Sequence, residues 1–235
     1  WPCASCCAPW IWHGAWCWGR VTPFLWAAGH RAFPVTLTGL GERAHLFSPD
    51  IRVETHVADV LAVIEAEEMV GAVLVGHSYA GNVVTAVADR LERAEALKRV
   101  VHLDAGIPDP GDSWSTGQAE ETKAARRAVI AEKGFLPPAD PSVFGLDGAD
   151  AAWVARRMTP QPPALYDDPI LFDPARVARF SRAFVDCTSP ALPTIDRSRR
   201  RVRSEPGWEV VEMATGHDPM VSRPKELAEI LLAWA

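Results

Sequence analysis

Ser78 is the residue whose surroundings point most directly to chemistry in this 235-residue sequence. It lies in the segment GHSYAG at positions 76–81, directly after the apolar run 72–75. A buried parallel strand that ends in Gly-X-Ser-X-small presents a serine hydroxyl at the start of a helix. The same turn aims the backbone N–H of Tyr79 at developing negative charge. The pattern therefore predicts a nucleophile, with an ordinary strand-to-helix turn as the alternative because Ala80 replaces glycine.

His217 is the histidine best placed to activate such a serine. A serine hydroxyl is a weak nucleophile until a neighbouring base accepts its proton. His217 lies in TGHDP at 215–219, between the last expected strand and the last expected helix, where a loop reaches back over the sheet edge. A surface-loop histidine is the alternative. His77 adjoins Ser78 but points elsewhere at such a turn. Four further histidines lack a comparable strand-end position: His30, His45, His56 and His102.

Asp104 is the carboxylate that we expect to orient His217. A triad acid follows the nucleophile and precedes the histidine in the chain, at the end of a strand. Asp104 ends the expected strand 99–103, whereas the segment TSPA at 188–191, where many serine hydrolases keep the acid, has no carboxylate. A helix cap is the structural alternative for Asp104, and Asp186 and Asp196 remain as other candidates for the acid.

Alternating strand and helix patterns must position these residues. Apolar runs indicate strands, and apolar residues three or four positions apart indicate helices. The expected strands are 2–8, 31–37, the apolar run that starts at 72 and leads to Ser78, 99–103, 183–187 and 208–213. The expected helices are 19–28, a helix that Thr55 caps and that has apolar positions 57, 60, 61 and 64, 79–91, 119–132, 149–157, 194–202 and 225–234. This order predicts an α/β fold with a mostly parallel sheet covered on both faces. We expect a core from 1–105 and 183–235 and a Pro- and Gly-rich helical cap over 106–182.

Composition narrows the class of protein. Hydrophobic residues make up 48% of the chain and the formal net charge is −6, which favours one large core and disfavours nucleic acid or an anionic membrane as partners. We interpret the arginine run at 197–203 as a solvated helix face. The odd cysteine count, with Cys3 and Cys6 unaccompanied by a second ligand pair, favours a reducing cytoplasm and predicts neither a disulfide framework nor a metal site.

The chain resembles the α/β-hydrolases over nearly its full length, and within them bacterial esterases, plant methylesterases and plant hydroxynitrile lyases. The resemblance rests on IWHGAWCW at 11–18, TGLGERAHL at 38–46, VGHSYAG at 75–81, LDA at 103–105 and GHD at 216–218. It implies Ser78 as nucleophile, His217 as base, a helical cap over the pocket and the N–H of Ile11 as second oxyanion donor. Pro9 and Trp10 depart from the family's His-Gly at that strand end. Asp218 replaces the lysine with which the lyases manage cyanide.

These residues together predict a cofactor-independent carboxylesterase that forms an acyl-enzyme on Ser78. A lactonase or thioesterase would use the same mechanism, and a hydrolase-fold protein that binds a small ligand is the alternative from another class. A hydroxynitrile lyase is disfavoured, because an anion at Asp218 would repel cyanide. A homodimer is left open. The expected pocket walls are Trp12, Trp114, Phe144, Trp153, Leu165, Tyr166 and Phe172.

Overall fold

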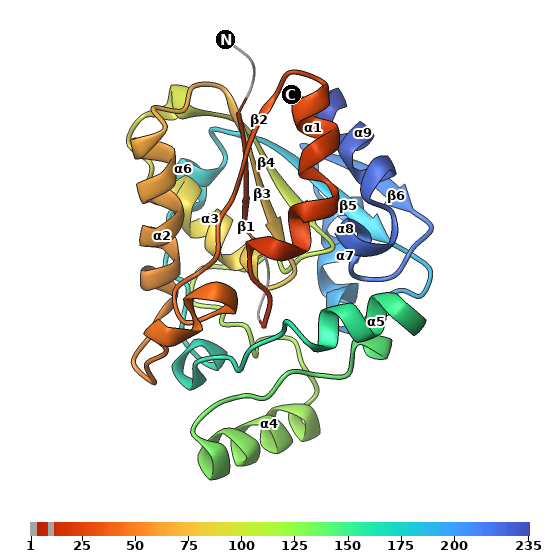
Figure 1. Ribbon diagram of the computed structural model, residues 1–235. Helices are drawn as coiled ribbons and strands as arrows, with labels where there is room; N and C mark the ends of the chain where they lie inside the picture. The colour runs from red at the N-terminus through yellow and green to blue at the C-terminus, as the bar shows by residue number, and fades with distance from the viewer. Residues whose placement is uncertain (1–3, 9–11) are drawn as a thin grey trace.

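A parallel sheet forms the centre of the molecule in the computed structural model (Figure 1). The structure describes residues 12–235 and, as backbone, residues 4–8. Within these residues six strands run in the order β2-β1-β3-β4-β5-β6, and all neighbours are parallel. The strands are β1 (Ala4–Ala8), β2 (Arg31–Pro34), β3 (Ala72–His77), β4 (Leu97–Leu103), β5 (Ser181–Cys187) and β6 (Trp208–Met213).

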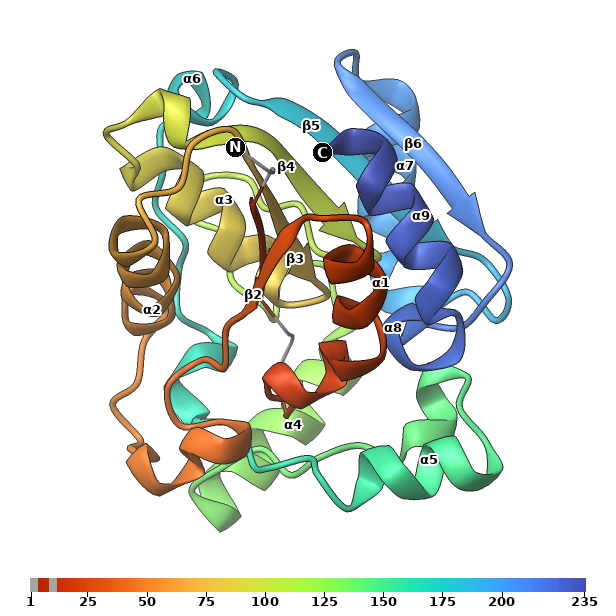
Figure 2. The same ribbon diagram turned by 45° about the horizontal axis from the view of Figure 1, so that its top comes forward.

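Helices cover both faces of this sheet, as Figure 2 shows. One face carries α1 (Thr22–Ala27), α8 (Pro219–Ser222) and α9 (Pro224–Trp234). The other carries α2 (Val53–Ala66), α3 (Ala80–Arg90) and α7 (Asp196–Ser204). Short 3₁₀ turns η1 (Ala15–Arg20), η2 (Gly41–Leu46), η3 (Ala94–Ala96) and η6 (Pro193–Ile195) connect these elements. The expected α/β fold with a doubly covered sheet is confirmed.

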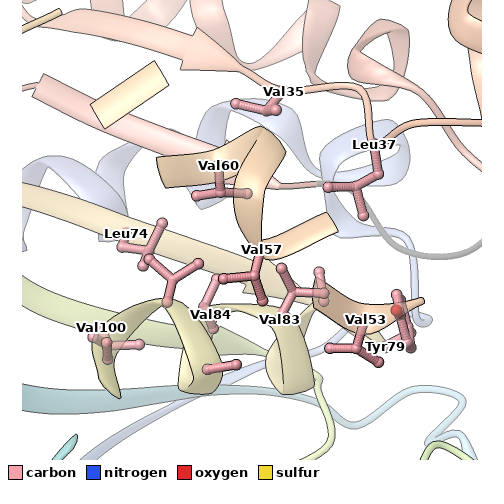
Figure 3. Packing of buried hydrophobic residues seen from close by; sticks show 14 of the residues in the cluster. Val35, Leu37, Val53, Val57, Val60, Leu74, Tyr79, Val83, Val84 and Val100 are labelled. Atoms are coloured by element: carbon pink, nitrogen blue, oxygen red, sulfur yellow. The ribbon is translucent and has the colours of Figure 1, made fainter. Parts of the chain in front are cut away.

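The central strand β3 is buried along its whole length because its successive side chains enter cores on opposite faces of the sheet. Val73 and Val75 pack with the residues of α1 and α9, whereas Leu74 packs with those of α2 and α3. Figure 3 shows Val57 and Val60 of α2 against this second core. The sheet is thereby held rigidly at the carboxyl end of β3, where Ser78 follows.

A long segment between β4 and β5 lies across the carboxyl end of the sheet (Figure 1). Its elements there are α4 (Glu120–Lys133), η4 (Pro141–Phe144), α5 (Gly148–Ala155) and η5 (Pro163–Tyr166). The last element of the segment, α6 (Pro174–Val177), lies beside α3 before the chain enters β5. In the described part of the chain, no helix combines the length and apolar character that crossing a bilayer requires.

Two expected elements differ from those observed. The predicted helix 19–28 is divided into η1 and α1, where Pro23 lies in the first turn of the new helix and suits its fixed backbone angle. The predicted strand 31–37 stops at Pro34. Beyond it, the Thr36 hydroxyl accepts a hydrogen bond from the N–H of Ala15 at 2.6 Å, which replaces strand pairing with a loop contact.

Candidate active site

Ser78 occupies a strained turn between β3 and α3. Its φ of +53° is in the left-handed region, which L residues rarely adopt without tertiary support. Gly76 is required there, because a Cβ at that position would lie 2.5 Å from the carbonyl oxygen of Ala80. The Ser78 N–H donates to the carbonyl of Leu103 at 3.1 Å, and its carbonyl accepts from Gly106 at 3.0 Å. The turn is therefore fastened to the end of β4.

Asp104 and His217 form a buried pair beside that turn. Asp104 follows β4, has a φ of +40° and donates its N–H to the carbonyl of Val185 at 2.7 Å. Its Oδ2 lies 2.6 Å from Nδ1 of His217, and both side chains are fully buried. Because a carboxylate only accepts, Nδ1 carries the hydrogen, and in the neutral ring Nε2 is the basic nitrogen.

The loop that carries His217 is held close to Ser78 from two sides. Nε2 of His77, the residue before Ser78, donates to the carbonyl of His217 at 2.7 Å, and the two rings are 4.6 Å apart. The His217 N–H donates to the carbonyl of Phe144 at 2.9 Å. Phe144 also contacts the His217 ring at 5.9 Å and lines the same pocket as Ser78. Ser78, His217 and Asp104 thus come from three strand ends to one corner of the sheet.

The two other candidate acids have different partners. The Asp186 carboxylate accepts hydrogen bonds from Nε of Arg199 at 2.5 Å and from Nη2 of Arg203 at 2.6 Å. The Asp196 carboxylate accepts a hydrogen bond from Nη1 of Arg199 at 2.9 Å. Both carboxylates are therefore parts of an arginine network, and Asp104 is the predicted acid whose contact with His217 is observed.

Arg199 is a site residue that the sequence interpretation missed. Its side chain is 10% exposed, and Nη2 donates to Oδ1 of Asp104 at 2.8 Å. The interpretation of 197–203 as a solvated face is wrong at this position. Val202, the apolar residue within this run, was the available sequence signal that the helix has an inward side.

Several buried histidines outside the pair are kept neutral. Burial lowers the pKa of His56 to about 4 and the pKa of His102 to about 3. Burial, with His217 as the next cause, also lowers the pKa of His77 well below its ordinary value. His56 donates through Nε2 to the carbonyl of Thr38 at 3.0 Å, so Nδ1 accepts from the Tyr79 hydroxyl at 3.2 Å. That contact orients the residue next to Ser78.

A pocket opens at Ser78 with an aromatic side and a polar side. The aromatic rings contact one another edge-on or tilted, with centroids 6.1 Å apart for Trp12 and Trp114 and 6.2 Å apart for Trp12 and Phe144. The aromatic lining is Trp12, Tyr79, Trp114 and Phe144; the polar lining includes Asn82, Asp112, Ser113, Gln118, Arg126 and Arg197. The pocket can therefore hold a largely apolar group next to the serine.

The remaining four expected pocket residues lie outside this lining. Trp153 packs edge-on against Trp16 at 5.1 Å, on the side of α1 and η1. Leu165 is fully buried in the core and Phe172 packs against it. Tyr166 supports the wall from behind, with its ring 5.1 Å from Trp114. These apolar side chains pack the cap, which the sequence alone does not distinguish from pocket lining.

Of the two expected oxyanion donors, the structure describes Tyr79 and does not describe Ile11. Tyr79 precedes α3 as its N-cap, where backbone N–H groups have no partner within the helix. Ile11 lies outside the described residues, as do Pro9 and Trp10. Cys3 is also outside them and the Cys6 side chain is not described; Cys17 and Cys187 are buried.

The family follows from a comparison with known proteins. Residues 11–230 match the model of the alpha/beta hydrolase family. The chain belongs to this family. The predicted resemblance is confirmed, because that match spans all three strand ends that carry Ser78, Asp104 and His217.

Relatives and solved structures of α/β-hydrolases agree with this assignment. A carbendazim hydrolyzing esterase from Nocardioides sp. (strain SG-4G) is 38% identical over 94% of this chain and 95% of its own. Esterase PIR7B of Oryza sativa subsp. japonica is 26% identical over 95% and 92%. An extracellular alpha/beta-hydrolase from a Paenibacillus species superposes with a TM-score of 0.84 at 17% identity, covering 100% and 99% of the two chains, which shows the fold. By this kinship the α/β-hydrolase described here is an esterase-type hydrolase.

Asp218 lies next to His217 in the chain of this α/β-hydrolase. Its carboxylate is fully buried, 3.6 Å from Nε2 of His13 and 3.9 Å from Nε2 of His77. Burial raises the pKa of Asp218, but His13, His77 and His217 lower it below its ordinary value overall. The carboxylate therefore lies among buried histidines, and it is not among the residues that line the pocket.

Proposed function

We propose that this α/β-hydrolase cleaves carboxylic esters through an acyl-enzyme on Ser78, with His217 as base and Asp104 as acid. The observation that carries the proposal is the 2.6 Å contact between Asp104 and His217 at the strand end to which the Ser78 turn is fastened. A carboxylate on Nδ1 selects the tautomer whose Nε2 can accept the serine proton.

In acylation, the Ser78 oxygen attacks the ester carbonyl carbon while Nε2 of His217 takes the hydroxyl proton. The carbonyl π electrons move onto oxygen, and the backbone N–H groups of Tyr79 and Ile11 stabilise that oxyanion. The tetrahedral intermediate collapses, the bond to the alcohol oxygen breaks, and the imidazolium returns its proton to the leaving alcohol. Asp104 stabilises the imidazolium throughout.

In deacylation, a water molecule replaces the alcohol. His217 removes one proton from the water as its oxygen attacks the acyl carbon, and the same two N–H groups hold the second oxyanion. Collapse breaks the bond to the Ser78 oxygen, which regains a proton from His217. The products are the carboxylic acid and the original enzyme, so the proposed cycle uses only groups of this chain and water.

The pocket favours small esters with an apolar, flat group. Trp12, Trp114 and Phe144 present ring faces and edges on the Ser78 side, and such surfaces pack well against planar groups. The relative from Nocardioides, a carbendazim hydrolyzing esterase, is compatible with a substrate of this kind. We also propose residues 106–182 as the cap and the remaining chain as the hydrolase core.

A reaction with fluorophosphonate tests the nucleophile and the main alternatives. The unaltered enzyme should be labelled and should hydrolyse p-nitrophenyl acetate, and Ser78→Ala should lose both properties. A thermal melt close to that of the parent shows that the variant is folded. An unlabelled parent that binds ligands without turnover would support a binding protein instead, and turnover that persists in Ser78→Ala would exclude Ser78 as nucleophile.

Comparing oxygen esters, lactones and thioesters separates activities that share the mechanism. We expect the highest kcat/KM for an oxygen ester with an aromatic group. A lactone or thioester that is turned over faster by an order of magnitude would assign a lactonase or thioesterase instead. The cytoplasmic location and the homodimer stay predictions.

A further inference from the structure

Arg199 of α7 holds the side of Asp104 that faces away from His217. Nη2 of Arg199 lies 2.8 Å from Oδ1 of Asp104, while Oδ2 of the same carboxylate contacts His217. The N–H of Cys187 also donates to Oδ1, at 3.4 Å. Each oxygen of Asp104 therefore has its own donors, and the carboxylate cannot rotate without breaking contacts on both sides.

The position of the Arg199 guanidinium is itself fixed from several directions. Nε donates to Asp186 at 2.5 Å, and Nη1 donates to Asp196 at 2.9 Å and to the carbonyl of Leu192 at 2.7 Å. Nη2 also donates to the carbonyl of Cys187 at 3.1 Å. A planar guanidinium with donors in a fixed fork transmits this rigidity to its partners, which a flexible ammonium does not.

The charges explain why a cation is needed at this place. Asp104 and Asp186 are both buried, at 0% and 1% exposure, and an unpaired buried carboxylate is strongly disfavoured. Burial lowers the pKa of Arg199, but Asp104 and Asp186 raise it above its ordinary value overall. The guanidinium thus stays charged and balances part of the negative charge that His217 would otherwise experience.

We infer that Arg199 is a positioning residue of the esterase: it aims Oδ2 of Asp104 at His217 and limits how strongly that carboxylate favours the imidazolium. The inference rests on the proposed function, because it assigns Asp104 as the acid. Residues 188–191, which follow β5, contain no carboxylate, so the acid follows β4 instead. Arg199 is the group through which α7 holds that acid in place.

The charge on Arg199 gives the inference a readout in the pH dependence of catalysis. Among the described residues, three titratable groups face His217: Asp104 after β4, His77 at the end of β3, and Asp218 in the same loop as His217. His13 lies on the other side of Asp218. Asp104 faces Arg199 from α7 and the Cys187 backbone from β5, with Asp186 behind them. Removing the cation stabilises the imidazolium more than the neutral ring, so the base loses its proton only at higher pH.

Arg199→Gln and Arg199→Lys test this in the full-length enzyme with p-nitrophenyl acetate. Arg199→Gln should lower the plateau of kcat/KM by roughly 10-fold and move the acidic limb of its pH profile upward by about one pH unit. Arg199→Lys keeps the charge without the fork, so its plateau should fall while its acidic limb stays in place. An acidic limb in Arg199→Gln that matches the parent would overturn the inference.

Arg203→Gln is the matched control. Arg203 also lies on α7 and donates to Asp186 at 2.6 Å, but its other carboxylate partner is Glu212. Its loss should leave the acidic limb unchanged. An equal shift in Arg203→Gln would assign the effect to Asp186 and contradict the role of Arg199.

A second pair of variants separates this inference from the proposed triad. If Arg199 acts through Asp104, Arg199→Gln should cost little further activity in an Asp104→Asn background. Full activity of Asp104→Asn would refute the proposed triad. If Asp104→Asn is impaired and the loss caused by Arg199→Gln adds to it in full, only the role of Arg199 is refuted and the triad stands. If Arg199→Gln does not give a cooperative thermal melt, the double variant Arg199→Met, Asp186→Leu removes the cation together with the carboxylate of Asp186. This variant allows the same pH measurement.

Discussion

Asp104 and His217 are joined by a 2.6 Å contact between buried side chains, although 113 positions separate them in the chain. The carboxylate follows β4, and the imidazole follows β6. Parallel strands end at the same edge of a sheet, which is why residues this far apart meet beside the turn after β3. The pair therefore depends on the whole sheet and not on any local motif.

Asp104→Asn should lower kcat by about 10³–10⁴-fold, because an amide that donates to Nδ1 selects the wrong tautomer of His217. The measurement is the steady-state hydrolysis of p-nitrophenyl acetate, with far-UV circular dichroism to confirm the fold. Asp196→Asn is the control and should remain within a few-fold of the parent. Activity close to that of the parent in Asp104→Asn, together with loss in the control, would move the acid to Asp196.

Stability should fall in acid because neutral histidines are buried. His56 and His102 have pKa values of about 4 and about 3 in the folded protein, against 6.5 for an ordinary histidine. Between pH 6.5 and about 4 the unfolded chain binds protons at these positions that the folded protein does not. The free energy of unfolding therefore decreases as pH falls, by about 1.4 kcal/mol per pH unit for each group, and levels off above pH 6.5.

Urea unfolding of His102→Gln at pH 7, 6 and 5 measures that contribution. The variant should show a shallower loss of stability with falling pH than the parent, by roughly one bound proton. His45→Gln, at an exposed position, should leave the slope unchanged. Parallel curves for His102→Gln and the parent would contradict a neutral buried His102.

Gly81→Ala should damage the Ser78 turn. A Cβ at Gly81 would collide with the carbonyl oxygen of Gly106 and lie 2.9 Å from Cβ of Ala105. Because the Gly106 N–H holds the Ser78 carbonyl, relief of this clash displaces the turn. We expect a loss of about 1–3 kcal/mol in the free energy of unfolding and a large loss of activity.

Gly19→Ala is the matched control for Gly81→Ala. A Cβ at Gly19 would meet no atom within 4 Å. Its unfolding free energy, measured in urea, should differ from that of the parent by less than about 0.5 kcal/mol. An equally stable and active Gly81→Ala would show that the close approach of α3 to Gly106 is not needed.

Trp114→Ala should change substrate preference more than basal turnover. Trp114 lines the pocket and contacts the rings of Trp12 and Tyr79 at 6.1 and 6.2 Å. Its loss should lower kcat/KM for p-nitrophenyl benzoate by roughly 10-fold and that for the acetate much less. Trp153→Ala, outside the lining, should affect both esters alike. If Trp114→Ala and Trp153→Ala change the ratio of kcat/KM for the benzoate to kcat/KM for the acetate equally, the assigned aromatic wall is contradicted.

The candidate site illustrates how far sequence patterns extend. The segment 76–81 indicates Ser78 by itself, because the turn's steric demands fall on residues adjacent in the chain. Strand ends likewise indicated Asp104 and His217, and the alternation of elements predicted the parallel sheet. The pocket was predicted less well: Trp12, Trp114 and Phe144 line it, whereas Trp153, Leu165, Tyr166 and Phe172 do not, since apolar packing and apolar lining use the same residue types.

Local order along the chain therefore determined the family, the doubly covered sheet and the serine turn. The tertiary structure alone separated Asp104 from the alternatives Asp186 and Asp196. It alone also decided which arginine of 197–203 turns inward to Asp104 and which aromatic rings face the pocket. These contacts join residues that lie on different elements, so they depend on how helices and strands pack. Hydropathy and spacing report the inward side of one element at a time, and they carry no information about the atom on the facing element.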